Sequence, residues 1–373
     1  MKESIPSPCY VLDENKLRSN LELIKQVSDR AGVEIILAFK AFSMWSAFPV
    51  VKEYIAGATA SSFNELRLCN EEMGVKAHAY FVAYKENEIE DVLKGSSHVT
   101  FNSISQFNAF KKQISGHKDQ VSFGLRVNPE YSEVSTDLYN PAASHSRLGV
   151  TVNQMPDVLP DAISGLHFHV LCESDSFALE NTLNEFEKKF AKYLKHVKWI
   201  NLGGGHLITR SGYDIEHLIQ VLKEFKERHD VSLIMEPGSA FAWQTGDLIT
   251  TVVDVVENGG VKTAIIDASF TCHMPDCLEM PYKPTVSESV AEGISYNLGG
   301  LSCLAGDFIA DFRFEKELKV GDRITFEDMI HYTMVKTSTF NGISHPSIGI
   351  IDQSGQFQLV REFNYEDFKN RLS

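Results

Sequence analysis

Residues 34–42 read EIILAFKAF, and this stretch decides how the rest of the chain is interpreted. The apolar run is long enough for a fully buried strand, and Lys40 stands between two Ala-Phe pairs at its end. Burying a lysine as a cation is costly, so Lys40 either reaches solvent or serves chemistry with a lowered pKa. Taken alone, a side chain that reaches solvent is the usual fate of a lysine at a strand end.

Apolar runs like 34–39 recur along the chain and alternate with segments of helical period. The further strand-like runs lie at 57–61, 78–83, 98–101, 122–127, 165–169, 199–202 and 232–236, and helical patterns lie at 14–27, 62–74, 177–194 and 214–225. Eight strands, most followed by a helix, predict an α/β fold with a (β/α)8 TIM-like barrel over residues 14–238. An open doubly wound sheet is the structural alternative.

The pattern changes after Gly238. Short β-like runs separated by turn residues lie at 247–260, 261–269, 322–328, 331–338, 347–352 and 356–360. They predict a β-sandwich or β-barrel domain over residues 239–373, which the extended residues 1–13 join.

Composition restricts the partners and the compartment. The 373 residues carry 50 acids against 35 Lys and Arg, a formal charge of −15, which argues against nucleic acid or an anionic membrane and suits a cationic ligand. No apolar run approaches the roughly 20 residues of a membrane span, and the N-terminus lacks a signal-peptide pattern. Six scattered cysteines predict reduced thiols in a cytoplasm. Cys272, His273 and Cys277 do not have a recognised zinc spacing, so no metal is expected.

Polar residues collect at the ends of the expected strands. Lys40 follows the first strand, Arg126 and Asn128 end the fifth, His167 and His169 end the sixth, Gly203–Gly205 follow the seventh, and Glu236 ends the eighth. The active site of such a barrel lies at the C-terminal ends of its strands, so these residues share one rim. Scattered structural residues would have no reason to gather there.

Each of these residues has a plainer interpretation, but together they match one chemistry. His169 could be a core histidine, and the EPG turn at 236–238 could be only a turn. A lysine in apolar surroundings can form a Schiff base, and an imidazole can stack on a flat ring. A carboxylate can hold a protonated pyridine nitrogen, and a glycine loop can take a phosphate. These are the requirements of pyridoxal 5'-phosphate.

The chain resembles the fold type III pyridoxal-phosphate decarboxylases, the alanine racemase-like barrel group that includes ornithine and diaminopimelate decarboxylases. The motifs that carry the resemblance are, in order, AFKAF, GLHFH, NLGGGH, EPG, the stretch 303–307 and HYT at 331–333. The resemblance covers nearly the whole chain. It implies a carboxy-lyase with pyridoxal phosphate as cofactor.

The resemblance also implies roles for individual residues. Lys40 would bind the cofactor covalently, His169 would stack on its ring, and Glu236 would pair with the ring nitrogen. The phosphate would be held by Gly203, Gly204, Gly205, Gly238 and Tyr332. Cys303 matches a cysteine that related enzymes contribute across a dimer interface to protonate the substrate carbon, which implies a homodimer with a shared active site.

Within the family, the segments GLHFHVLCE and CHMPDCLEMPYKP resemble the carboxynorspermidine and carboxyspermidine decarboxylases of polyamine biosynthesis. Such an enzyme would take a small cationic carboxypolyamine and release norspermidine or spermidine. Acids should bind its ammonium groups, and the residues expected at the substrate are Asp276, Glu279, His273, Asp307 and Glu236.

Departures from the wider family bear on the substrate. Ser239 stands where relatives often have arginine, and Leu171 and Cys172 stand where relatives have a Gly-Ser pair. These changes argue against an ornithine or diaminopimelate substrate. The alternatives are another fold type III decarboxylase of a basic or diamino acid, a racemase of the same barrel, and a non-catalytic pyridoxal-phosphate-binding protein. The presence of both Lys40 and Cys303 disfavours the last.

Overall fold

The computed structural model describes residues 4–143 and 145–373 and divides into two compact units. The first, called here the barrel unit, spans Asn20–Phe241. The second, called the sheet unit, combines the chain up to Ser19 with Ala242–Ser373. Within the described residues, no helix is both long and apolar enough to cross a membrane.

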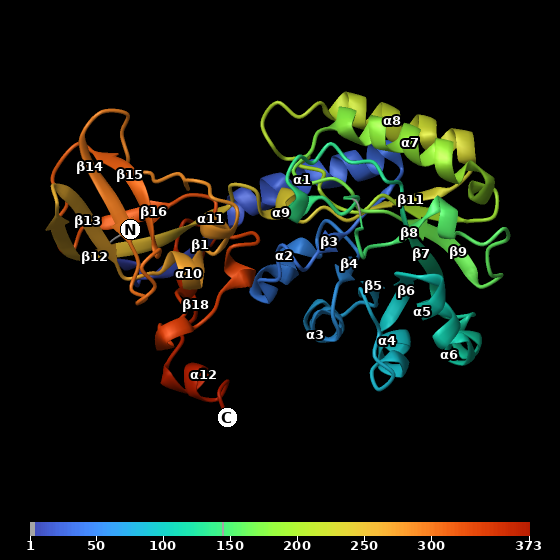
Figure 1. Ribbon diagram of the computed structural model, residues 1–373, viewed down its shortest axis with the longest axis horizontal. Coiled ribbons are helices and arrows are strands. Elements are labelled where there is room, and N and C mark those ends of the chain that lie inside the picture. Colours follow the sequence, from blue (N-terminus) through green and yellow to red (C-terminus); the bar gives the residue numbers. More distant parts are fainter. Residues whose placement is uncertain (1–3, 144) are drawn as a thin grey trace. The chain divides into compact units, whose positions relative to one another are not determined.

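The barrel unit is built on one parallel sheet (Figure 1). Its strands are β2 (Glu34–Ile35), β3 (Leu37–Ala38), β4 (Ala58–Ala60), β5 (Ala77–Tyr80), β6 (Ser96–Phe101), β7 (Ser122–Asn128), β8 (Val150–Thr151), β9 (Ile163–His167), β10 (Trp199–Asn201) and β11 (Ser232–Met235). They pair in the order β2-β11-β10-β9-β7-β6-β5-β4-β3, with β8 beside β7.

The stretch 34–38 closes this sheet on itself. Its first half, β2, pairs with β11 and its second half, β3, pairs with β4. Between them, the N–H of Ile36 donates to the carbonyl of Met235 at 2.9 Å, and the N–H of Leu37 donates to the carbonyl of Gly57 at 3.2 Å. Because one strand joins both ends of the sheet, the barrel predicted from the sequence is confirmed.

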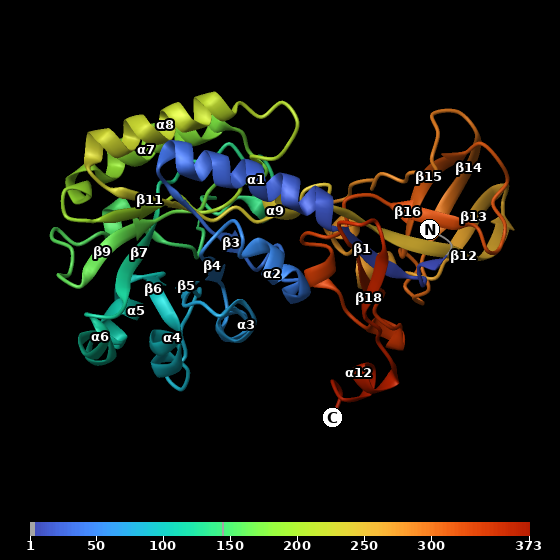
Figure 2. The same cartoon turned by 180° about the vertical axis from the view of Figure 1, so that it is seen from behind.

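Helices cover the outside of the barrel. They are α1 (Glu14–Ala31), α2 (Phe48–Val51), α3 (Phe63–Leu68), α4 (Ile89–Gly95), α5 (Ile104–Ala109), α6 (Lys111–His117), α7 (Ser176–Leu194), α8 (Ile215–His229) and α9 (Ser239–Ala242). The two long helices α7 and α8 lie side by side, and Figure 2 shows the pair from behind. Each begins at an aspartate that caps it: Asp175 accepts from Ala178 N–H, and Asp214 accepts from His217 N–H.

The barrel interior contains one large aromatic side chain. Trp199 of β10 is only 5% exposed, and its indole N–H donates to Ser122 Oγ at 2.8 Å. A Cβ atom added at Gly124 of β7 or at Gly165 of β9 would overlap the indole. The two glycines therefore leave the space that the tryptophan fills.

The sheet unit holds an eight-stranded mixed sheet. Its strands are β1 (Cys9–Asp13), β12 (Gly246–Asn258), β13 (Val261–Ile266), β14 (Ile294–Gly299), β15 (Phe308–Phe314), β16 (Arg323–Phe326), β17 (Ser347–Ile351) and β18 (Phe357–Arg361), and its short helices are α10 (Phe270–His273), α11 (Asp276–Glu279) and α12 (Tyr365–Lys369). The order is β15-β14-β13-β12-β1-β17-β18, and β16 pairs with β12. The N-terminal strand β1 lies between β12 and β17, antiparallel to one and parallel to the other.

One segment expected to be extended is not a strand. Residues 331–338 form turns and a 3₁₀ helix at Met334–Lys336. Tyr332 has a φ of +50°, and its carbonyl accepts the N–H groups of Val335 and Lys336 at 3.1 Å. The alternation of apolar residues suggested a strand, but this local turn satisfies the backbone, so that prediction is wrong.

Candidate active site

Lys40 lies in the turn that follows β3 and is half-buried. Its Nζ lies 3.3 Å from Nε2 of His169, which stands two residues beyond the end of β9. Burial, and then the positive charge of Arg126, lower the pKa of Lys40, although Glu236 acts in the opposite direction. The contact between Lys40 and His169 thus joins the ends of the first and sixth strands. The lowered pKa makes this lysine easier to deprotonate than one in solvent.

The hydrogen bonds of His169 fix where its proton lies. The backbone N–H of Gly204 donates to Nδ1 at 2.8 Å, so Nδ1 carries no hydrogen. Burial, and then the charges of Lys40 and Arg126, lower the pKa of His169 well below its usual value, so the ring is neutral. Its single N–H is therefore on Nε2, the nitrogen that faces the amine of Lys40.

Glu236 follows β11 and is only 8% exposed. Asn201 Nδ2 donates to Oε1 at 2.7 Å, and His167 Nε2 lies 3.4 Å from Oε2. Burial alone would raise the pKa of this carboxyl, but His167 and the amide of Asn201 outweigh burial and lower the pKa to about 2. The side chain is therefore an ionised carboxylate at neutral pH, the form that pairs with a protonated ring nitrogen.

Arg126, seen in the sequence only as a polar strand end, is buried beside these groups. Its Nη2 donates to the carbonyl of His169 at 3.1 Å, and its guanidinium lies 4.7 Å from the ring centre of Tyr80. Tyr80 in turn donates from its hydroxyl to Asn102 Oδ1 at 2.8 Å. Tyr80 and Asn201, the last residues of β5 and β10, were not predicted at the site, although each is a polar strand end like Asn128 and His167.

The glycine loop after β10 approaches its neighbours closely. Gly203 and Gly205 have φ values of +70° and +89°, and a Cβ at Gly205 would overlap the carbonyl of Leu171. A Cβ at Gly204 would overlap the carbonyl of Glu236. Only glycine allows this path, which places the loop against the ends of two neighbouring strands.

Two of the three loop N–H groups already have partners. Gly203 N–H donates to Asn201 Oδ1 at 2.9 Å, and Gly204 N–H donates to His169. Within the described part of the chain, this leaves the N–H of Gly205 open to a ligand. Gly238 stands at the same rim, where a Cβ would overlap the methyl of Ala41 beside Lys40.

These side chains fit pyridoxal phosphate. Lys40 supplies an amine whose pKa is lowered by burial, His169 a neutral flat ring, and Glu236 an ionised carboxylate, all held by contacts within the barrel unit. The glycine loop runs so close to neighbouring backbone that only glycine fits at its three positions. The barrel therefore has groups suited to covalent attachment, to stacking and to pairing with a ring nitrogen, and the N–H of Gly205 is suited to a phosphate.

The remaining expected residues lie in the sheet unit. Cys303 is exposed, and its backbone N–H donates to Asn341 Oδ1 at 2.8 Å. Asp307, only 4% exposed, accepts from Ser269 Oγ at 2.8 Å and from Ser302 N–H at 3.0 Å. Asp307 thus fixes the loop that carries the thiol.

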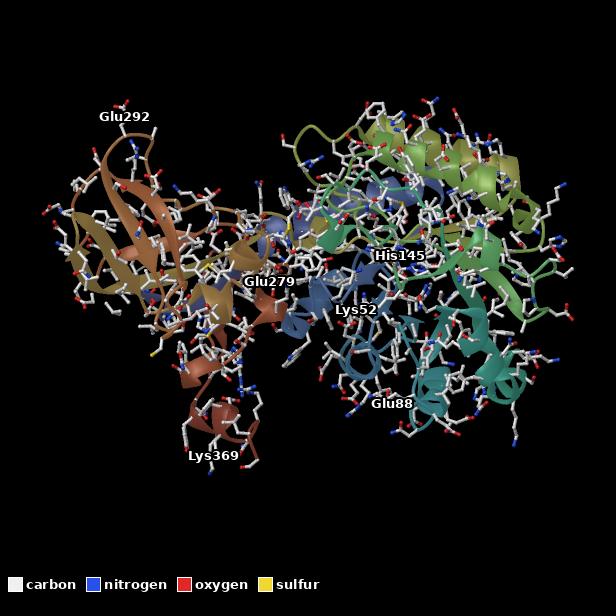
Figure 3. The ribbon with its side chains drawn as sticks, in the orientation of Figure 1. Lys52, Glu88, His145, Glu279, Glu292 and Lys369 are labelled. Atoms are coloured by element: carbon white, nitrogen blue, oxygen red, sulfur yellow. The ribbon has the colours of Figure 1, made fainter. Side chains whose placement is uncertain are left out.

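Asp276 and Glu279 lie together on α11, and both contact Lys336. The ammonium of Lys336 donates to Asp276 Oδ1 and to Glu279 Oε2, the latter at 2.6 Å. The Asp276 side chain is 17% exposed and that of Glu279, labelled in Figure 3, is 51% exposed. The two acids therefore form a site that holds one alkylammonium group.

His273 is completely buried inside the sheet unit. Its Nδ1 accepts from Ser269 N–H at 3.2 Å, and its carbonyl accepts from the Tyr10 hydroxyl at 2.6 Å. Burial lowers the pKa of His273 to about 4, so its ring is neutral at pH 7. Tyr332 begins the 3₁₀ turn described above and is half-buried.

Comparison with known proteins identifies the family. The family model described as "Pyridoxal-dependent decarboxylase, C-terminal sheet domain" matches residues 9–330. The chain belongs to the pyridoxal-dependent decarboxylases. These matches confirm the family that was inferred from the sequence. They also confirm the decarboxylase activity and pyridoxal phosphate as the cofactor.

Individual decarboxylases match over the full length. Carboxyaminopropylagmatine decarboxylase of Synechocystis sp. is 50% identical over an alignment of 373 positions, which covers 99% of this chain and 96% of that protein. Carboxynorspermidine/carboxyspermidine decarboxylase of Campylobacter jejuni is 42% identical over 99% of both chains. The crystal structure of carboxynorspermidine decarboxylase complexed with norspermidine, from Campylobacter jejuni, superposes with a TM-score of 0.91 at 40% identity, covering 98% of this chain and 100% of that one.

Proposed function

We propose that this decarboxylase removes CO2 from a carboxylated polyamine, converting carboxynorspermidine or carboxyspermidine to norspermidine or spermidine. The relative from Campylobacter jejuni is named for both substrates, and its solved structure is complexed with norspermidine. The observation that carries the reaction is the 3.3 Å contact of Lys40 Nζ with His169 Nε2, on the rim that also holds an ionised Glu236.

In this proposal, the barrel unit holds the cofactor. When bound, pyridoxal phosphate takes up the electrons released as the carboxylate departs. Lys40 would attach the cofactor through its amine, His169 would lie against the ring, and Glu236 would hold the ring nitrogen. The phosphate is assigned to Gly203, Gly204, Gly205, Gly238 and Tyr332, and of the three loop glycines Gly205 has the N–H that remains open.

Asp276 and Glu279 bind the cationic part of the substrate. Their joint hold on the Lys336 ammonium supports this, because a substrate ammonium makes the same contacts. Two carboxylates against one lysine leave the cluster with a net negative charge, which suits one further cationic group. Glu236, His273 and Asp307 remain predicted substrate neighbours.

Cys303 delivers the proton that replaces CO2 on the substrate carbon. Its exposure, on a loop anchored by Asp307, supports a thiol that serves a site outside its own fold. We therefore propose a homodimer in which the Cys303 loop of one subunit completes the site of its partner. The dissociable proton of a thiol suits this role.

A second candidate substrate is carboxyaminopropylagmatine, favoured by the 50% identity to the decarboxylase named for it. An agmatine group ends in a guanidinium, which binds carboxylates through two parallel hydrogen bonds. The acids Asp276 and Glu279 are suited to either end group. The two substrates therefore need to be compared directly.

Cytoplasmic localisation belongs to the same proposal. All six cysteines are free thiols in the described structure, and two of them, Cys172 and Cys303, are exposed. Exposed thiols of this kind persist in a reducing compartment.

The deciding experiment measures CO2 release from carboxynorspermidine, carboxyspermidine and carboxyaminopropylagmatine by the cofactor-loaded protein. We expect kcat/KM for one of the three to exceed that for ornithine and diaminopimelate by at least about a hundredfold, because unpaired polar groups in a mismatched site are penalised. Release from ornithine or diaminopimelate at equal efficiency would refute the substrate assignment. Lys52→Ala, at an exposed lysine on the barrel unit (Figure 3), is the control and should retain full activity.

A further inference from the structure

Asn201, the last residue of β10, links two parts of the cofactor site through one buried amide. It is only 3% exposed. Its Oδ1 accepts the N–H of Gly203 at 2.9 Å, and its Nδ2 donates to Glu236 Oε1 at 2.7 Å. The oxygen thus faces the glycine loop and the nitrogen faces the carboxylate.

The bond to Gly203 shapes the loop. An asparagine that accepts the N–H two residues ahead closes an Asx turn, and Gly203 continues this turn with a φ of +70°. The carbonyl of Gly203 then accepts the N–H of Glu236 at 2.8 Å. The loop and the residue after β11 are therefore joined both by the backbone and by the Asn201 side chain.

The bond to Glu236 orients a charged group. A buried carboxylate needs hydrogen-bond donors, and Asn201 serves Oε1 while His167 Nε2 lies 3.4 Å from Oε2. Serine at position 201 would be too short to reach Glu236, and leucine would make neither bond. An amide supplies an acceptor for the loop and a donor for the carboxylate at once.

We propose that Asn201 is a positioning residue that fixes the glycine loop and the ring-nitrogen carboxylate Glu236 in one geometry, so that the two ends of the cofactor are bound together. This inference rests on the proposed role of Glu236 at the ring nitrogen.

The test compares Asn201→Ser, which keeps the turn acceptor, with Asn201→Leu, which loses both bonds. Affinities are measured for pyridoxal phosphate, for pyridoxal and for 1-deazapyridoxal phosphate, which lacks the ring nitrogen. We expect Asn201→Ser to bind pyridoxal phosphate about tenfold more weakly than wild type and to lose the preference for it over the deaza analogue. Asn201→Leu should also lose about tenfold of the preference for pyridoxal phosphate over pyridoxal.

Asn140→Ser is the matched control. Asn140 is half-buried, is not among the residues placed on the active-site rim, and closes the same kind of turn by accepting Ala142 N–H at 2.9 Å. This variant should leave all three affinities within about twofold of wild type. Should Asn201→Leu fail to fold, the deaza comparison with Asn201→Ser decides alone.

Two outcomes would overturn the proposal: an Asn201→Ser protein that keeps the wild-type preference for the ring nitrogen, or equal losses in Asn201→Ser and Asn140→Ser. Failure of the wild-type protein to bind pyridoxal phosphate would instead refute the proposed function.

Discussion

Lys40 and Glu236 in the barrel unit and Cys303 in the sheet unit are held in different ways. In the barrel unit, Lys40 and Glu236 each meet a partner from another strand end of the same barrel, at His169 and Asn201. In the sheet unit, Cys303 is exposed and only its backbone is anchored. The groups that fit the cofactor are thus ordered by contacts within the barrel unit, whereas the proposed proton donor presents an exposed thiol.

The largest effect is expected at Lys40. Lys40→Ala removes the amine that attaches the cofactor, so decarboxylation should fall by at least about 10⁴-fold. The absorption band of the lysine-bound cofactor should disappear while the protein stays folded by circular dichroism. Retention of that band would show that the barrel unit does not hold the cofactor through this residue.

Cys303→Ala tests the role of the exposed thiol in the sheet unit. Loss of the proton donor should lower kcat by about 10²- to 10³-fold and leave cofactor absorption intact, since general acid catalysis contributes on this scale. Mixing this variant with Lys40→Ala should restore about a quarter of the sites if the partner subunit completes each one. A mixture that stays as inactive as its components would exclude the shared site.

Asp276→Asn separates substrate binding from chemistry. We expect KM for the carboxypolyamine to rise about tenfold with kcat within about twofold, because the lost charge acts on the distal cation. Glu279→Gln should have a smaller effect, since its side chain is 51% exposed and water screens its charge. If kcat fell and KM did not change, these acids would not be the cation site.

The smallest effect concerns the stability of the barrel in acid. Burial lowers the pKa of His78 to about 3 and that of His98 to about 4. Below pH 6.5 these two histidines take up protons in the unfolded chain but stay neutral in the folded barrel. The free energy of unfolding is therefore highest above pH 6.5 and decreases as the pH drops toward 4. His98→Gln should reduce the slope of the unfolding free energy by up to about 1.4 kcal/mol per pH unit, measured by urea titration between pH 4.5 and 6. An unchanged slope would show that His98 does not contribute.

The sequence predicted the barrel because short apolar runs alternate with helical patterns, and polar residues stand at or just after the ends of several of these runs. Lys40, His169 and Glu236 could be placed on one rim from that pattern alone, since the C-terminal ends of parallel strands meet there. The contact of Lys336 with Asp276 could not be predicted, because it joins residues 60 positions apart in a loop-rich region. The segment 331–338 was assigned wrongly because apolar alternation does not reveal the left-handed backbone of Tyr332.

Asn201 shows a further limit of sequence reasoning. The residue type and its position were visible in the sequence. The two hydrogen bonds of its amide require Glu236 and Gly203 to lie on opposite sides of it, which only the closed barrel provides.

Trp199, with Gly124 and Gly165 facing it, restricts how this barrel can evolve. A methyl group at either glycine collides with the indole, and a smaller residue at 199 leaves a cavity that costs about 3–5 kcal/mol. No single substitution among the three keeps the interior filled, so the positions must change together. A descendant that lost the tryptophan would be expected to carry larger residues at both glycine positions.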